Sequence, residues 1–389
     1  MSAFPNYGAA RIAELEAQAA AVLGVFAARG YARAEPSVLQ PADIFLDRSG
    51  EEIRRRTFVF TDPAGTELCL RPDLTIPICR QQVASGASYP ARLCYNGLVF
   101  RHQPAEPERP TQFYQAGAEL LGLEDRAAAE TELLELTIGA LGAAGLDALS
   151  VKLGDLGLFS AFVDALEIPP QWRGRLKRHF WRADYFEALL RRMSGAGESD
   201  AQHLLAHLGA LPPAEARSAF EGLMDLMGGA PQGGRTREEI VDRLIEQSAD
   251  AAALTLDQKT TGSLAKLLAV SGPATRSLAE IEALTKAAGV SLAEPLQAMQ
   301  RRLETLKALG IEPERISFSA RFGRNMEYYT SFVFELWSRD AEGPVQIAGG
   351  GRYDTLLEHL GAGRSIPAIG CAIRTERLMA ARRAQAAGR

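Results

Sequence analysis

Polar side chains that could bind a small charged molecule concentrate in five short segments of the chain. In the first, Asp73 and Thr75 lie two residues apart, so an extended backbone would present their oxygens on one face. Two acceptors on one face suit an ammonium group. In the second, Arg101 follows an apolar run, and its guanidinium can form a bidentate pair with a carboxylate or a phosphate. These two segments predict binding residues for opposite charges.

The third segment covers residues 112–119, in which Gln115, Gly117 and Glu119 alternate. Alternation along a strand places the three on one face, where the missing side chain of Gly117 leaves room for a ligand. Each segment alone also has a structural explanation: Asp73 could cap a helix, and Glu119 could pair with an arginine. We therefore base the prediction of a binding site on the segments as a set.

The fourth segment joins Arg324 to two adjacent phenols, Tyr328 and Tyr329, just before a predicted strand. The fifth consists of residues 349–354, where three glycines precede an Arg-Tyr-Asp sequence, together with residues 370–377 near the end of the chain. The glycines match neither a phosphate loop nor a dinucleotide fingerprint, because no Gly-Lys-Ser/Thr follows them. We expect them to form a strand-to-helix turn that brings backbone close to the ligand.

The elements that must position these residues follow from periodicity. Apolar residues recur at three- and four-residue steps over residues 7–28 and predict an amphipathic helix. Residues 31–122 contain short β-rich runs between prolines and glycines, which predict antiparallel strands. Residues 62–65, Asp-Pro-Ala-Gly, have the length and composition of a hairpin turn. A second helix is expected over residues 124–141.

The middle of the chain, residues 160–309, is rich in Ala, Leu, Glu and Arg and poor in β-branched runs. It predicts a mainly helical insertion, whereas strands resume after residue 311 and a closing helix is expected over residues 369–381. Strands on both sides of a helical block predict an α+β core built from residues 1–159 and 310–389.

Composition excludes several classes of protein. The chain has 389 residues, 47% hydrophobic content and a net charge of −5, so it can bury a large core, and bulk binding of nucleic acid is not indicated. We expect no membrane span and a cytoplasmic location. The four cysteines have no zinc-site spacing. His203 and His207 are four residues apart but have no evident acidic third ligand, so we expect no metal and no cofactor.

The order and spacing of the five segments resemble the catalytic core of class II aminoacyl-tRNA synthetases, specifically histidyl-tRNA synthetase. The resemblance covers nearly the whole chain and is strongest over residues 30–122 and 316–378. It implies an antiparallel sheet flanked by helices and a homodimer formed through the motif 1 region. It also implies a set of histidine-binding residues: Asp73, Thr75, Arg101, Gln115, Glu119, Arg324, Tyr328 and Tyr329.

In the synthetase pattern, Asp73 stands where a glutamate binds the α-amino group, with Thr75 beside it. Arg101 matches the motif 2 arginine that holds the carboxylate and the α-phosphate of ATP. Glu119 and a tyrosine would contact the imidazole nitrogens, and Arg324 would approach the carboxylate. The resemblance thus implies a ligand with ammonium, carboxylate and imidazole groups.

The nucleotide half of the pattern departs from the synthetase. Gln103 replaces a glutamate next to the adenine, and Arg374 occupies a small-residue position where its side chain could fill the nucleotide cleft. Arg377 matches the motif 3 arginine for the distal phosphates. We therefore expect a vestigial nucleotide site, formed by Gln103, Arg109, Arg374 and Arg377, and no catalytic residues.

No segment after Arg377 could form the anticodon-binding domain that the synthetase uses to recognise tRNA. The ATP phosphoribosyltransferase regulatory subunits are similar in both respects, and the stretch over residues 57–80 resembles them more than a working synthetase. This resemblance implies a non-catalytic subunit that binds histidine, forms a homodimer within a hetero-oligomer and partners the short-form catalytic subunit in histidine biosynthesis. The alternatives are an adenylate-forming histidine ligase that does not act on tRNA, and a synthetase that borrows its anticodon domain.

Overall fold

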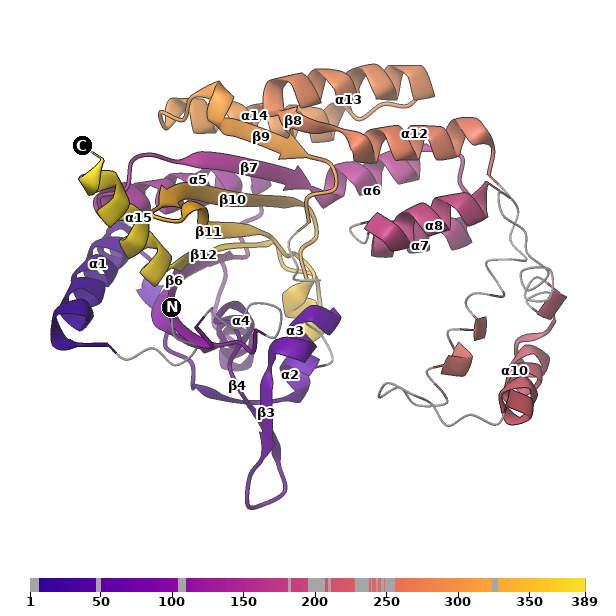
Figure 1. The fold of residues 1–389 in the computed structure, drawn as a ribbon, viewed down its shortest axis with the longest axis horizontal. Coiled ribbons are helices and arrows are strands. Elements are labelled where there is room, and N and C mark those ends of the chain that lie inside the picture. Colours follow the sequence, from indigo (N-terminus) through magenta and orange to yellow (C-terminus); the bar gives the residue numbers. More distant parts are fainter. Residues whose placement is uncertain are drawn as a thin grey trace. The chain divides into compact units, whose positions relative to one another are not determined.

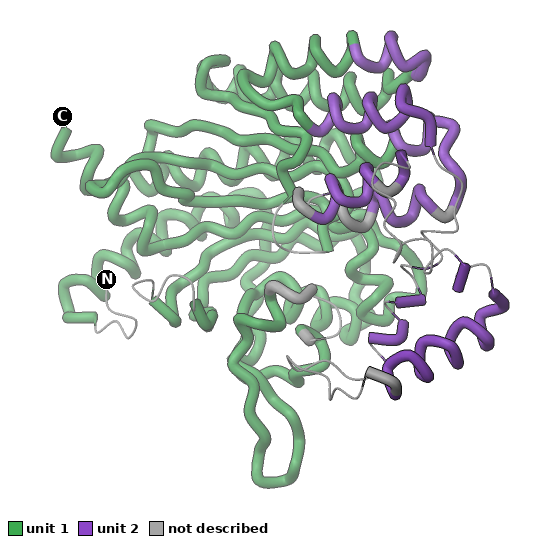
Figure 2. The backbone as a smooth tube through the Cα atoms, turned by 45° about the vertical axis from the view of Figure 1, so that its right-hand side comes forward, with its two compact units in different colours: residues 1–161, 269–283, 291–389 green, residues 162–268, 284–290 purple. Residues whose placement is uncertain are grey.

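The computed structural model describes residues 7–46, 50–103, 110–180, 183–194, 207–208, 211–227, 256–323 and 328–388, with isolated positions between 238 and 248. The chain forms two compact units, which Figure 2 shows in different colours. Unit 1 comprises residues 1–161, 269–283 and 291–389, and unit 2 comprises residues 162–268 and 284–290. Every predicted binding residue belongs to unit 1.

Within the described residues, nine strands of unit 1 form one sheet (Figure 1). Its central strands are antiparallel throughout, as expected, whereas β1 and β9 pair parallel with β5 and β7 near the two edges. An α+β core with a mostly antiparallel sheet is thus confirmed. In spatial order the strands are β1 (Ala32–Arg33), β5 (Ala91–Phe100), β6 (Gln112–Leu121), β12 (Ala368–Arg374), β11 (Gly343–Arg352), β10 (Phe332–Asp340), β7 (Ser150–Asp155), β9 (Ile316–Ser319) and β8 (Ser271–Pro273).

Long helices cover one face of this sheet. Helix α1 (Ala9–Ala28) follows its predicted periodicity, burying Leu15, Val22 and Phe26. It packs against α5 (Arg126–Ala143) and α15 (Thr375–Ala387), and α14 (Ala293–Ala308) also packs on α5. The Asp125 side chain caps α5 by accepting a hydrogen bond from the Ala128 N–H at 3.0 Å. Both N-terminal helices predicted from the sequence are present.

A second sheet of unit 1 carries the predicted hairpin. It has the order β2 (Leu39–Pro41), β4 (Glu67–Leu70), β3 (Phe58–Thr61). The β3–β4 turn is held by Asp62, whose carboxylate accepts from Ala64 N and Thr66 N at 2.8 Å, and Gly65 supplies the positive φ of 86°. Around this sheet lie α2 (Asp43–Leu46), α3 (Gly50–Arg56) and α4 (Thr75–Ser85).

Unit 2 is helical in the part that the structure describes. Its helices are α7 (Pro170–His179), α8 (Ala183–Met193), α10 (Pro213–Met227) and most of α12 (Gln258–Ala269), while α6 (Leu156–Ala165) and α13 (Ala274–Ala288) cross the unit boundary. Residues 269–283 and 291–309, which we expected in the insertion, group with unit 1 because α14 packs on α5. Two further short helical segments of unit 1 are η1 (Pro313–Arg315), a 3-10 helix, and η2 (Glu358–Ala362), a π-helix.

Two local predictions were wrong. The expected helix over residues 369–381 is strand β12 up to Arg374, because this segment is inserted between β6 and β11, and only then becomes helix. The glycines at 349–351 lie inside β11 instead of forming a turn. A Cβ on Gly350 would lie 2.2 Å from the Gly370 carbonyl oxygen, and one on Gly351 would lie 2.6 Å from that of Phe332. The glycines therefore permit close packing of neighbouring strands.

Candidate functional site

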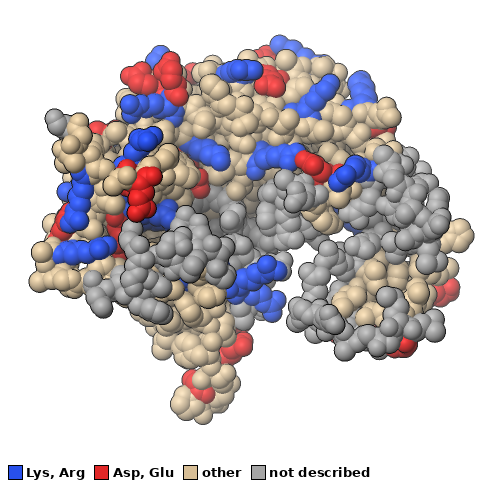
Figure 3. All heavy atoms as spheres, viewed as in Figure 1, with Lys and Arg blue, Asp and Glu red and all other residues tan. Residues whose placement is uncertain are grey.

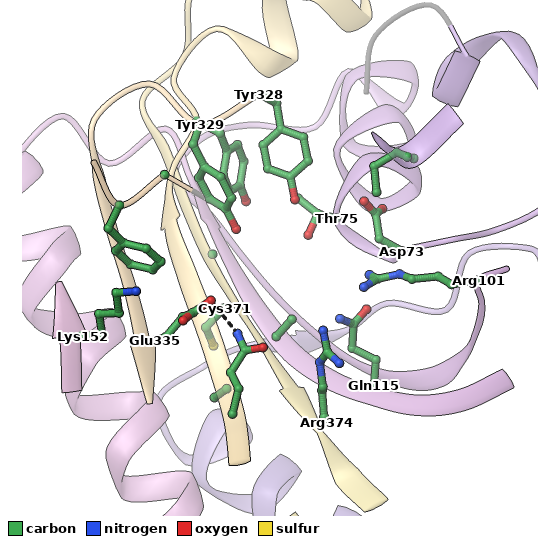
Figure 4. A pocket seen from close by; sticks show the side chains of 18 of the residues that line it. Asp73, Thr75, Arg101, Gln115, Lys152, Tyr328, Tyr329, Glu335, Cys371 and Arg374 are labelled. Carbon is green, nitrogen blue, oxygen red and sulfur yellow. Dashed lines mark hydrogen bonds between the residues drawn. The ribbon is translucent and has the colours of Figure 1, made fainter. Parts of the chain in front are cut away.

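A cavity of about 370 Å³ opens on the side of the large sheet opposite the α5–α14 layer. Side chains from the large sheet, from α3 and α4 and from the loops that join these elements line it (Figure 4). This volume falls within the range of small-molecule pockets. Its polar and charged lining consists of Arg56, Asp73, Thr75, Arg101, Gln115, Lys152, Tyr328, Tyr329, Glu335, Gln346, Tyr353 and Arg374.

Asp73 and Thr75 both line the cavity, but the backbone between them is not extended. Asp73 Oδ1 accepts a hydrogen bond from Ile76 N at 3.2 Å, so the residue helps to begin α4, and Thr75 is already in the helix. Its other oxygen, Oδ2, is buried and accepts no hydrogen bond. Burial raises the pKa of Asp73 to about 6, although Arg101 and the Ile76 N–H oppose this shift. Capping thus uses only half of the carboxylate.

Gln115 and Arg101 project into the same end of the cavity as Asp73 (Figure 4). Gln115 Oε1 is the second buried acceptor in this lining that accepts no hydrogen bond. Arg101 is buried, donates from Nε to the Pro72 carbonyl at 2.7 Å, and lies with its guanidinium carbon 5.5 Å from the centre of the Phe113 ring. The structure therefore places two unsatisfied acceptors next to a fixed cation.

Glu119 lies behind the cavity wall and is fully buried. Thr75 Oγ1 donates to Oε1 at 2.7 Å, Tyr95 Oη lies 3.2 Å from the same oxygen, and Tyr353 Oη donates to Oε2. Burial raises the pKa of Glu119 to about 8, although the hydroxyl donors lower it. Thr75 and Tyr353 separate this carboxyl group from the cavity, so Glu119 supports the lining.

The expected space at Gly117 is occupied. A Cβ on Gly117 would lie 2.4 Å from Tyr95 Oη and 2.2 Å from the Cys371 carbonyl oxygen. Tyr95 and Gly117 are paired across strands β5 and β6, so the tyrosine ring lies over the glycine. The prediction that this gap admits a ligand was wrong, because a neighbouring side chain fills it.

Three tyrosines form one wall of the cavity. Tyr328 and Tyr329 have ring centres 4.8 Å apart, and Tyr353 packs edge-on against both at 5.6 and 6.4 Å. Tyr328 and Tyr329 point inward in Figure 4. Arg324, predicted beside them, lies outside the described residues. Tyr353 belongs to the fifth sequence segment, residues 349–354, but is not among the binding residues that the resemblance implies.

The far end of the cavity contains charged residues that the sequence did not single out. Lys152 and Glu335 are directly opposite each other on β7 and β10. Glu335 accepts from Gln346 Nε2 at 2.9 Å and from Trp337 Nε1 at 3.1 Å, and Lys152 Nζ lies 4.5 Å from the Phe322 ring centre. None of these positions shows a local sequence signal, because strand pairing alone brings them together.

The predicted nucleotide residues are dispersed. Arg374 lines the cavity, with its guanidinium carbon 5.7 Å from the Phe113 ring centre. Gln103 is held outside, donating to the Pro110 carbonyl at 2.7 Å and accepting from Arg56 at 2.9 Å. Arg377 donates to the Gln346 carbonyl at 3.2 Å from α15. Arg109 lies outside the described residues.

Among the described residues, no group of three or more His, Cys, Asp or Glu side chains could hold a metal ion, and the four cysteines are buried free thiols. His203 lies outside the described residues. No helix in the described part of the chain has the length and apolarity to cross a membrane.

Comparison with known proteins supports the relationship suggested by the motifs. The Histidyl-tRNA synthetase family model matches residues 5–220 and 220–378. The ATP phosphoribosyltransferase regulatory subunit of Mesorhizobium japonicum is 37% identical over 94% of this chain and 97% of its own length. That of Brucella anthropi is 35% identical over 88% of this chain and 91% of its own.

Solved structures show the same fold. A protein described as an ATP phosphoribosyltransferase regulatory subunit/histidyl-tRNA synthetase from Bacillus halodurans aligns with a TM-score of 0.66 at 22% identity, covering 98% of this chain and 82% of its own. The apo histidyl-tRNA synthetase of S. aureus aligns with a TM-score of 0.59 at 17% identity, covering 99% and 73%. The chain belongs to the family of ATP phosphoribosyltransferase regulatory subunits, non-catalytic proteins built on a histidyl-tRNA synthetase-like core.

Proposed function

We propose that this regulatory subunit binds histidine in the 370 Å³ cavity and reports its occupancy to a short-form ATP phosphoribosyltransferase catalytic subunit. Histidine is the end product of the pathway that this transferase begins, so the cavity would serve feedback inhibition. The regulatory chain would act as a homodimer within a cytoplasmic hetero-oligomer, and we expect no tRNA to bind.

The observation that carries this proposal is the pair of unsatisfied acceptors, Asp73 Oδ2 and Gln115 Oε1. Burying a polar atom without a partner costs about 1 to 3 kcal/mol, so two in one cavity indicate a ligand that donates hydrogen bonds. One acceptor belongs to a carboxylate, which favours a cationic donor such as the α-ammonium group of an amino acid.

The rest of the lining suits the other groups of histidine. Arg101 supplies a buried cation near Asp73 for the α-carboxylate. The hydroxyls of Tyr328 and Tyr329 provide donors and acceptors for the imidazole nitrogens, and their rings provide apolar faces. Glu119, to which the resemblance assigns an imidazole contact, would instead orient Thr75 and Tyr353 through hydrogen bonds.

Occupancy of the cavity can be transmitted through α3. Ile53 and Arg56 of this helix line the cavity, and Arg56 Nη2 donates to Gln103 at 2.9 Å. Regulation requires two states of the complex with different histidine affinity. A coupling factor of about 5 to 150 corresponds to roughly 1 to 3 kcal/mol.

The ligase alternative gains no support from the nucleotide residues. Gln103 is engaged with Arg56 and Pro110, and Arg374 lies against the Phe113 ring. A ligase must form an adenylate, so it would exchange pyrophosphate into ATP when histidine is present. We expect no such exchange above the level without histidine.

Calorimetry with a small set of ligands tests the assignment. Histidine should bind, whereas histamine, which lacks the carboxylate, and imidazole-propionate, which lacks the ammonium, should each bind at least tenfold more weakly. Gln115→Ala should weaken histidine binding by a similar factor. Asp125→Asn is the control, because Asn caps a helix as well as Asp and residue 125 lies outside the cavity. Equal affinity for all three ligands would contradict the proposal.

A further inference from the structure

The small sheet of unit 1 has an outward face made entirely of apolar residues. Strand register assigns its members, because residues directly opposite each other share a face: Leu39 pairs with Leu70, and Leu70 with Phe58, whereas Pro41 pairs with Leu68, and Leu68 with Phe60. None of these six side chains is buried, and Leu39 and Phe60 keep 45% and 41% of their surface exposed.

The other face of this sheet packs on the hydrophobic core. Cys69 is fully buried and belongs to a core cluster with Phe45, Ile53 and Ile76. An antiparallel sheet with one face on the core normally carries polar residues on its other face. Here the face turned away from the core is apolar instead, and such an exposed face on a folded domain marks an interaction surface.

The face is presented for contact by the shape of the hairpin. Strands β3 and β4 project away from the large sheet, and β3 is an edge strand with one unpaired side (Figure 1). In Figure 3 this projection is largely uncharged, with acidic side chains toward its tip. Arg54 and Arg55 are exposed on α3, directly before β3. A complementary partner would carry an apolar patch with carboxylates near the base of the hairpin.

The same hairpin is continuous with the wall of the cavity. Helix α3 contributes Ile53 and Arg56 to the lining and leads after one residue into β3. The first residue of β3, Phe58, contacts His102 at 5.9 Å between ring centres, and the His102 carbonyl accepts from Arg56 Nε at 3.3 Å. A protein bound to this face would touch the elements that line the ligand cavity.

We infer that the outward face of the β2–β4–β3 sheet, defined by Leu39, Pro41, Phe58, Phe60, Leu68 and Leu70, is the docking surface for the catalytic subunit. The inference rests on the proposed function, which requires a catalytic partner that responds to the cavity. Continuity with α3 favours that partner over a second copy of this chain, because a regulatory signal must reach the enzyme.

The test uses two neighbouring residues of β3 with matched exposure. Phe60, 41% exposed, lies on the apolar face, whereas Val59, 39% exposed, points to the other side. Phe60→Ser should weaken binding of full-length regulatory chain to a short-form catalytic subunit at least tenfold in biolayer interferometry, as expected for an aromatic anchor. Val59→Ser should change it less than threefold. Leu68→Ser, a cross-strand neighbour of Phe60, should repeat the loss.

Two further measurements separate the outcomes. Histidine calorimetry should give wild-type affinity for Phe60→Ser, which shows that the chain is folded, and sedimentation should give its unchanged oligomeric state. Unchanged affinity for the catalytic subunit overturns the inference. So does a change confined to self-association, which would assign the face to a second copy. If the wild-type chain itself fails to bind the catalytic subunit, the proposed function fails and the inference falls with it.

Discussion

The two faces of the large sheet differ in whether their buried polar groups have hydrogen-bond partners. On the cavity side, Asp73 Oδ2 and Gln115 Oε1 are buried without a partner. On the helix side, Arg302 donates to Glu130 at 2.7 Å and to Asp155 at 2.5 Å. Arg352 donates to Glu130 and Asp354 at 3.1 and 3.0 Å. The cavity lining therefore leaves two acceptors unsatisfied, whereas the charged groups on the helix side pair with one another.

This difference distinguishes residues that bind a ligand from residues that stabilise the fold. A buried ionic network whose members satisfy one another needs no ligand and holds elements together, here α5, α14 and the ends of β7 and β11. Unsatisfied acceptors in a cavity are costly until a ligand arrives, and so they indicate a site. Consecutive residues Arg352 and Tyr353 link the two, since the first joins the network and the second lines the cavity.

The largest expected effect is on the helix side. Arg302→Met should lower the free energy of unfolding by about 3 to 5 kcal/mol, because it leaves Glu130 and Asp155 buried with one cation fewer. Urea unfolding followed by circular dichroism measures this loss. The triple variant that also replaces Glu130 and Asp155 with Gln and Asn should recover part of it. A loss below about 1 kcal/mol for the single variant would mean that this network is not structural.

The next effect concerns Glu119, whose pKa in the folded chain is about 8 instead of the ordinary 4.5 because it is buried. The folded state then holds the proton more tightly than the unfolded state. The resulting stability is complete below pH 4.5 and is lost as the pH rises from 4.5 through 8.

Glu119→Gln, which cannot ionise, should remove this loss. The wild-type free energy of unfolding should fall relative to that of the variant by up to about 1.4 kcal/mol per pH unit, the slope for one proton. Urea titrations at pH 5, 6, 7 and 8 test the difference. Parallel curves for the two proteins would show that Glu119 is already ionised in the folded state.

Asp73 should affect binding more than folding. Asp73→Asn removes the negative charge proposed for the ammonium group, so histidine affinity at pH 7.5 should fall at least tenfold, which is about 1.4 kcal/mol. Because burial raises the pKa of Asp73 to about 6, wild-type affinity should also decline as the pH falls through 6. The variant lacks this titration, so the ratio of the two affinities should shrink at pH 5. A constant ratio would exclude Asp73 from recognition of the ammonium.

The smallest effect is expected at an exposed ion pair. Arg29, which directly follows α1, and Glu135 of α5 lie 2.8 Å apart, but their side chains are 54% and 36% exposed. Arg29→Ala should therefore change the free energy of unfolding by no more than about 1 kcal/mol. This variant is the reference for Arg302→Met, since both remove one arginine that pairs with a glutamate of α5. Equal losses would remove the contrast between buried and exposed pairs.

The sequence predicts the local elements better than their combination. The α1 periodicity and the β3–β4 turn are local patterns, and both are confirmed. Residues 369–374 alternate Ile, Cys and Ile with Gly and Ala, and they directly precede a true helix. Only pairing with β6 and β11, far apart in the chain, makes them a strand. Short apolar runs leave that choice open.

In the site too, the sequence predicts local features but not contacts between distant segments. The residues near Asp73 and Gln115 could be selected by type and spacing, and the fold brings them into one cavity. The position of Glu119 behind Thr75 and Tyr353 could not be predicted, because it depends on side chains from three separate segments. No sequence pattern indicates the ionic network, because Glu130, Asp155 and Arg302 are widely separated in the chain.

The most direct test of the central claim is formation of phosphoribosyl-ATP from ATP and phosphoribosyl pyrophosphate by a short-form catalytic subunit from the same source. The account predicts activity that depends on this chain and falls when histidine is added. It also predicts that Asp73→Asn supports the same activity but requires at least tenfold more histidine for inhibition. Activity indifferent to this chain, or inhibition by histidine that is unchanged in the variant, would contradict it.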